Sequence, residues 1–176
     1  SHESSLHFSA QAMASQPTRH DPAKVKLAPY HPDTPTLRYT HARYLDNIVK
    51  IDDVVGRVVA ELKEDGLLED TFVFYFGDHG GVLPRGKGYA YESGLHVPLV
   101  VRVPKNFRHL VKEKPGSRQQ GFVGFIDFGP TVLNLAGADI PKLIDGRPFL
   151  GKGAVTREFT FGYADRFDEK YDLVRW

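Results

Sequence analysis

The chain has 176 residues, with 23 Lys and Arg against 22 Asp and Glu, so its formal net charge is +1 with the histidines neutral. A charge so close to zero argues against a nucleic-acid-binding protein, which would carry a strongly basic face. The chain has no Cys, which excludes disulfides, thiolate metal sites and a cysteine nucleophile within it. No apolar run approaches the roughly 18–20 residues that a membrane-spanning helix needs.

The first third of the chain divides into an irregular segment and a long helix. Residues 1–33 are poor in aliphatic residues and rich in Ser, His and Pro, so we expect mostly irregular structure there. Thr34 suits a helix cap, and Pro35 suits the first helical position. Apolar residues then recur in steps of three and four and predict an amphipathic helix that stops at Gly66: Tyr44, Ile48, Ile51, Val55, Val58 and Leu62.

The rest of the chain alternates predicted strands with a helix. Residues 71–76 form an unbroken β-branched and aromatic run, typical of a strand buried on both faces in a parallel sheet. Further strands are predicted over residues 97–103 and 158–163. Between them, residues 127–136 predict a short helix with Asp127 as its cap and Gly137 as its stop. The order of these elements predicts an α/β fold.

Two residues with metal-ligating side chains, Asp78 and His79, follow directly after the strand predicted at 71–76. Ligands of open α/β sheets bind at the carboxyl ends of the strands, so this is where a site is expected. A carboxylate oxygen and an imidazole nitrogen side by side can bind a cation, and the flanking glycines allow close approach. A plain turn, in which Asp78 accepts backbone N–H bonds, remains the alternative at this point.

Lys87 lies nine residues beyond Asp78, between Gly86 and Gly88. Its ammonium can reach an oxyanion as a point charge, although the spacing is not that of a phosphate-binding P-loop. A lone lysine between glycines is more often a solvated loop residue. Its combination with an Asp-His pair after the same strand favours an anion-binding role.

The chain resembles the sulfatases of the alkaline phosphatase superfamily over roughly residues 29–151. The resemblance rests on five motifs, which are Phe-Tyr-Phe-Gly-Asp-His-Gly at 74–80, Gly-Lys-Gly at 86–88, Tyr-Glu-Ser-Gly at 91–94, Val-Pro at 97–98 and Phe-Ile-Asp-Phe-Gly-Pro-Thr at 125–131. It implies part of a mixed, mostly parallel sheet sandwiched by helices, incomplete in this chain. Residues 1–33 would be an irregular leader, 34–151 the C-terminal portion of the catalytic domain, and 152–176 the continuation toward a C-terminal subdomain.

The resemblance also implies residue roles. Asp78 and His79 would be ligands of a divalent cation, usually calcium, and Lys87 would bind the sulfuryl oxygens as the sulfur–oxygen bond breaks. His2 would be the histidine that contacts the sulfate or the leaving group, and Asp165-Arg166 either faces the substrate or forms a surface ion pair. His79 resembles the branch of the family that includes glycosaminoglycan and sulfamate-type sulfatases.

One family feature, the nucleophile, is expected to be missing. The family converts a Cys or Ser, in a short motif with Pro and Arg, into formylglycine, and we expect no serine of this chain to lie in that motif. The chain would then be an inactive fragment of a metal-dependent sulfatase acting on a sulfate ester or sulfamate of a sugar, exported to the periplasm, the lysosome or the outside of the cell. Its missing half or another protomer would cover the sheet edges. The alternatives are a phosphoryl-transferring hydrolase of the superfamily and a non-catalytic fragment that keeps the fold.

Overall fold

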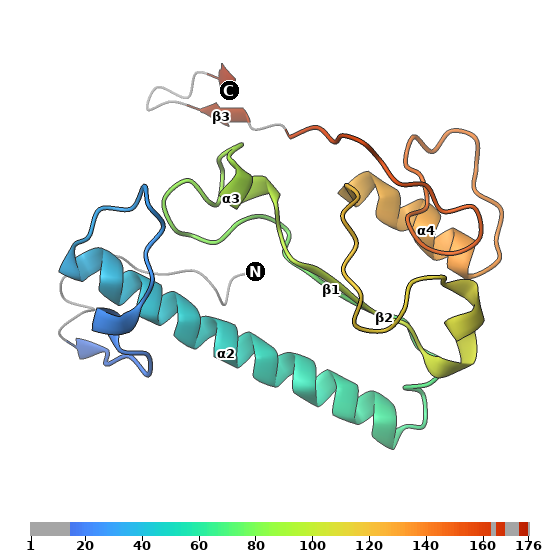
Figure 1. Ribbon diagram of the computed structural model, residues 1–176, viewed down its shortest axis with the longest axis horizontal. Helices are drawn as coiled ribbons and strands as arrows, with labels where there is room; N and C mark the ends of the chain where they lie inside the picture. Colours follow the sequence, from blue (N-terminus) through green and yellow to red (C-terminus); the bar gives the residue numbers. More distant parts are fainter. Residues whose placement is uncertain (1–14, 163–164, 168–172, 176) are drawn as a thin grey trace. The chain divides into compact units, whose positions relative to one another are not determined.

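The computed structural model of the chain describes residues 15–162, 165–167 and 173–175 (Figure 1). Two compact units make up the chain, one comprising Ser1–Asp65, Phe74–Val100 and Tyr163–Trp176, the other Gly66–Val73 and Val101–Gly162. Within the described residues, no helix combines the length and apolarity needed to cross a membrane. The elements are η2 (Pro22–Lys24), α2 (Pro35–Glu64), β1 (Val73–Phe76), α3 (Glu92–Leu95), β2 (Leu99–Arg102), η3 (Lys105–Leu110), η4 (Phe125–Asp127), α4 (Phe128–Leu135), β3 (Asp165–Phe167) and β4 (Leu173–Arg175).

The long helix α2 begins and ends as the sequence predicts. The Oγ1 atom of Thr34 accepts the backbone N–H of Leu37 at 3.2 Å, and Pro35 is the first helical residue. Pro35 lacks an N–H, which would have no helical partner at this position. The helix ends at Glu64, and Gly66 turns the chain with a φ of 72°. Figure 1 shows α2 as one continuous helix.

Burial along α2 differs from the predicted apolar stripe. The fully buried side chains all lie in its first half, between Leu37 and Asn47. Beyond them, Ile48 and Val58 are 37% and 44% exposed. The first half packs against the segment that contains η2, whereas the described residues leave the second half half-buried or exposed.

The strands form two separate two-stranded sheets, β1 with β2 and β3 with β4. β3 and β4 are antiparallel, with Asp165 opposite Arg175. The prediction that β1 is buried on both faces is wrong for this chain, since its residues are half-buried and Phe76 is 43% exposed. In the described residues β1 pairs with β2 and belongs to no larger sheet, so too few neighbours are present to cover its apolar faces.

The second unit is organised around the buried carboxylate of Asp127, which is 1% exposed. Asp127 precedes α4 as predicted, but its side chain does not cap that helix. Its oxygens instead accept N–H groups from Gly124, Arg147 and the Arg157 guanidinium. Burial opposes ionisation of Asp127, but these donors outweigh it and hold its pKa below the usual value. Asp127 is therefore an anchor for distant segments of this unit.

The strand predicted at 158–163 is wrong for its described residues, 158–162. Phe122 and Arg157 form an isolated antiparallel bridge, and the chain is irregular immediately after it. Phe159 and Phe161 are 63% and 88% exposed. The apolar alternation of this segment finds no neighbouring strand among the described residues, so no ladder forms.

Candidate functional site

The loop between β1 and β2 carries Asp78, His79 and Lys87 in the first unit. The Nε2 atom of His79 lies 3.7 Å from Oδ2 of Asp78. The other oxygen, Oδ1, accepts the backbone N–H of His79 at 3.1 Å. Asp78 thus does accept a backbone N–H, as expected of a plain turn, but its second oxygen stays directed toward the imidazole.

The orientation of the His79 ring is fixed by a hydrogen bond of its other nitrogen, Nδ1. Nδ1 lies 2.9 Å from the carbonyl oxygen of Gly80. A carbonyl only accepts, so Nδ1 carries a hydrogen, and in the neutral imidazole Nε2 is then the nitrogen with the lone pair. An imidazole held in this way by a carbonyl is the usual arrangement of a metal-ligating histidine.

Asp78 and His79 therefore fit a cation as adjacent ligands. Ligand distances of about 2.3–2.6 Å to a calcium-sized ion are compatible with donors 3.7 Å apart. The Asp78 side chain is 57% exposed and the His79 side chain 33%, so both can reach an ion in solution. No group of three or more metal-ligating side chains occurs in the part of the chain that the structure describes. These two residues, one oxygen and one nitrogen donor, would supply only part of the six to eight ligands that calcium takes, most of which are oxygens.

The loop folds back on itself through its glycines. A Cβ at Gly80 would lie 1.9 Å from the carbonyl oxygen of Ser93, and one at Gly86 would lie 2.0 Å from that of Gly81. No side chain can occupy such positions, which explains glycine there. The backbone N–H of Lys87 donates to the Gly81 carbonyl at 2.8 Å. This bond holds the backbone of Lys87 beside Gly81, two residues after His79.

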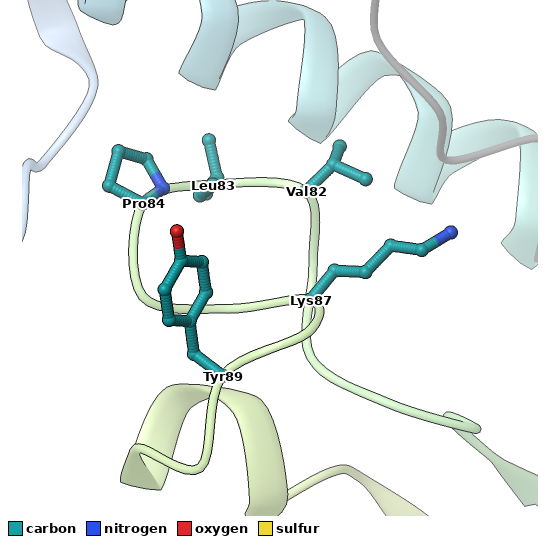
Figure 2. Close-up of a pocket in the computed structure, with 5 residues that line it drawn as sticks. All are labelled: Val82, Leu83, Pro84, Lys87 and Tyr89. Carbon is teal, nitrogen blue, oxygen red and sulfur yellow. The ribbon is translucent and has the colours of Figure 1, made fainter. Parts of the chain in front are cut away.

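The exposed side chain of Lys87 borders a pocket of about 300 Å³ in this loop (Figure 2). In Figure 2 the Tyr89 ring points toward Leu83 and Pro84, while the Lys87 side chain extends away from Tyr89. Four of its described lining residues are apolar or aromatic, namely Val82, Leu83, Pro84 and Tyr89, and Lys87 is the only charged residue among the described ones. A cation beside an apolar surface suits an anion joined to an organic group.

Two sequence-based assignments fall outside the described structure. His2 lies outside the described residues, and of Asp165-Arg166 only the backbone is described. Asp78, His79 and Lys87 are therefore the predicted site residues that the structure brings onto one loop.

The sequence corrects one expectation about the serines. Ser15 is followed by Pro17 and Arg19 with the spacing Ser-x-Pro-x-Arg, so one serine does match the short motif. Residues 1–14 contain no Asp. The segment packs against α2, where the carbonyl of Gln16 accepts the Tyr39 hydroxyl at 2.9 Å.

Sequence reasoning missed the residues that support the Lys87 loop. The ring of Tyr44, on α2, lies against Gly81, where a Cβ would be 2.8 Å from it, and burial raises the pKa of the Tyr44 phenol. His31 Nε2 lies 3.3 Å from the carbonyl oxygen of Pro84. No sequence signal identifies such contacts, because they join residues 37 and 53 positions apart and depend on the fold.

Comparison with known proteins decides the family. The sequence profile described as Sulfatase matches residues 1–138, which is more than half of the chain. The chain belongs to the sulfatase family. It is 36% identical to an ulvan-active sulfatase of Formosa agariphila over 86% of its own length, and 30% identical to human N-sulphoglucosamine sulphohydrolase over 67%. It spans about a quarter of the length of these sulfatases, 25% and 22% respectively.

Solved structures confirm the predicted fold. A phosphonate monoester hydrolase from Silicibacter pomeroyi shares 31% identity at a TM-score of 0.59, over 83% of this chain and 29% of that one. A protein solved with its substrate D-glucosamine-2-N,6-O-disulfate matches at a TM-score of 0.60 and 24% identity, over 81% of this chain and 31% of its own. The sulfatase chain thus has an α/β fold of the alkaline phosphatase type, of which it contains a part.

Proposed function

We propose that this chain is part of a metal-dependent sulfatase that hydrolyses sulfate esters or sulfamates of sugars. The observation that carries the proposal is that one loop bears the Asp78-His79 pair, whose side chains bond to the loop backbone, and Lys87, whose backbone N–H bonds to Gly81. Membership of the sulfatase family supports sulfate ester hydrolysis as the reaction. A sugar is favoured because relatives named for ulvan and N-sulphoglucosamine align with most of this chain.

The proposed roles follow from the chemistry of the side chains. Asp78 and His79 would hold a divalent cation, most simply calcium, which when bound polarises the sulfuryl oxygens. Lys87 would bind the same oxygens as a point charge and stabilise the negative charge that develops as the sulfur–oxygen bond breaks. His2 would assist the leaving group as a general acid. We also propose that the protein is exported and acts outside the cytoplasm, as the resemblance to exported members of the family implies.

The nucleophile, a formylglycine in this family, is proposed to come from a segment other than the one described. Ser15 has the motif spacing, but its segment is occupied by structural contacts with α2. We therefore propose that this chain alone does not turn over substrate, and that a further segment or a second protomer also covers the exposed faces of β1. An aldehyde at Ser15, detected by mass spectrometry as the loss of two hydrogens, would contradict this assignment.

The test compares the complete protein that carries this chain with the chain alone, on an aryl sulfate and on a sulfated glucosamine. We expect turnover by the complete protein only, and a fall in kcat/KM of roughly 10²–10³-fold in K87A. The matched control is K63A, a lysine in the last turn of α2. Full activity in K87A would sink the proposed role of Lys87.

A second candidate is hydrolysis of phosphate or phosphonate esters. It is favoured by the likeness to a phosphonate monoester hydrolase, and a point-charge lysine binds phosphoryl as readily as sulfuryl oxygens. Assaying an aryl phosphonate in parallel separates the two candidates. A higher kcat/KM for the phosphonate would favour this second function, and no turnover of either ester by the complete protein would favour a non-catalytic role.

A further inference from the structure

Arg85 has a backbone conformation that its residue type disfavours. The backbone N–H of Gly86 donates to the carbonyl of Leu83 at 2.9 Å, which closes a four-residue turn with Pro84 second and Arg85 third. Arg85 has a φ of 64°, which makes it the non-glycine residue with positive φ in the described chain. Turns with proline second and a positive φ third normally place Gly or Asn at the third position. An arginine there costs free energy that other contacts must offset.

The side chain of Arg85 supplies such contacts. Its guanidinium carbon lies 4.7 Å from the centre of the Tyr30 ring and 5.2 Å from that of the Tyr91 ring. Both distances are within the range of cation–π attraction, about 6 Å. Tyr30 precedes α2 and Tyr91 precedes α3, so Arg85 joins the turn to two other segments of the same unit.

The backbone on both sides of Arg85 is fixed as well. The Ser93 hydroxyl donates to the Arg85 carbonyl at 2.6 Å, and His31 Nε2 lies 3.3 Å from the Pro84 carbonyl. Since a carbonyl only accepts, His31 donates this bond. Lys87 is the second residue after Arg85, and its own N–H is held by Gly81. The dihedral angles at Arg85 and the bond from the Lys87 N–H to Gly81 together fix where the Lys87 backbone lies.

We propose that Arg85 is a positioning residue for Lys87. The two tyrosine rings hold its guanidinium, this contact keeps the turn in its disfavoured conformation, and the turn sets where the Lys87 ammonium meets a sulfuryl group. The inference rests on the proposed function, because it requires Lys87 to bind the anion of the substrate.

The test uses the complete protein and substitutions that tolerate the positive φ. R85G and R85N keep the turn without strain but cannot reach the tyrosine rings. We expect the Kd for inorganic sulfate and the KM for an aryl sulfate to rise roughly ten-fold, which corresponds to about 1.4 kcal/mol, with an unchanged or higher unfolding temperature. Y30F, which keeps an aromatic ring, is expected to bind sulfate like the wild type, and Y30A is expected to resemble R85G.

A double-mutant cycle separates positioning from a general structural role. If Arg85 acts through Lys87, R85G in a K87A background changes sulfate binding no further. Full additivity of the two substitutions, or wild-type sulfate binding by both R85G and R85N while K87A binds weakly, would overturn the inference alone. Unchanged sulfate binding by K87A would overturn the role of Lys87 in the proposed function, and the inference with it.

Discussion

His79 presents its Nε2 atom 3.7 Å from Oδ2 of Asp78, while its Nδ1 is held by the carbonyl of Gly80. The two candidate ligand atoms, Nε2 of His79 and Oδ2 of Asp78, lie near each other because a backbone carbonyl orients the imidazole and a backbone N–H orients the carboxylate. The two side chains could therefore bind an ion without a change in the backbone of the loop.

Calcium is therefore expected to stabilise the complete protein through Asp78. At a hundred times its Kd, calcium would add about 2.7 kcal/mol to the free energy of unfolding. D78N is expected to weaken calcium binding by roughly 10–100-fold or more, measured by thermal unfolding with calcium and with a chelator. D52N, an exposed aspartate on α2, serves as the control. Identical unfolding temperatures with calcium and with chelator would count against the site.

Gly86 is expected to tolerate no side chain. In G86A the added Cβ would meet the Gly81 carbonyl oxygen at 2.0 Å, which is backbone and cannot move aside. We expect a loss of about 2–3 kcal/mol in stability, together with a loss of sulfate binding, since the same carbonyl holds Lys87. The matched control is G129A in α4, where nothing lies within 4 Å of the new Cβ. G129A should be neutral or stabilising by up to about 1 kcal/mol. Equal stabilities of the two variants would contradict the prediction.

Asp127 makes the stability of its unit dependent on acid pH. Its pKa is lower in the folded chain than the unfolded value of about 3.9, so its contribution is complete above that value and is lost as pH falls through the folded pKa. We expect D127N to lower stability at pH 7 by about 3 kcal/mol, since Arg157 loses its charged partner. Urea unfolding between pH 7 and pH 3 measures both effects. D139N, at an exposed position after α4, should keep the wild-type pH profile. A D127N profile as steep as the wild type would disprove this account.

Asp46 attaches the segment before η2 to α2. Its carboxylate accepts the backbone N–H groups of Arg19 and His20, each at 3.0 Å, and lies 2.7 Å from His20 Nδ1. D46A is expected to release this segment, at a cost of about 2–3 kcal/mol, and to accelerate tryptic cleavage after Arg19. D53A, an exposed position on the same helix, should leave the cleavage rate unchanged. The same rate in D46A and the wild type would exclude the anchoring role.

Local patterns in the sequence were sufficient for α2, for the strand before Asp78 and for the choice of the candidate residues. The start of α2 at Pro35, its stop near Gly66 and the strand before Asp78 all follow from capping residues, turn residues and apolar runs, which act between near neighbours. The placement of Asp78, His79 and Lys87 on one loop also follows from the sequence, because a buried-strand pattern ends just before them.

Long-range contacts were decided by the tertiary structure alone. Three contacts join segments that no local pattern connects. Asp127 pairs with Arg157, Asp46 anchors residues 19–20, and Arg85 contacts the rings of Tyr30 and Tyr91. The sequence also predicted a buried β1 and a strand at 158–163, and both predictions were wrong. An apolar pattern indicates that a segment tends to be buried, but it does not identify the neighbouring segment that would bury it. The sequence by itself thus excluded cysteine chemistry within the chain and argued against a strongly basic nucleic-acid-binding face. Only the fold decided which charged side chains pair, because those pairs join distant segments.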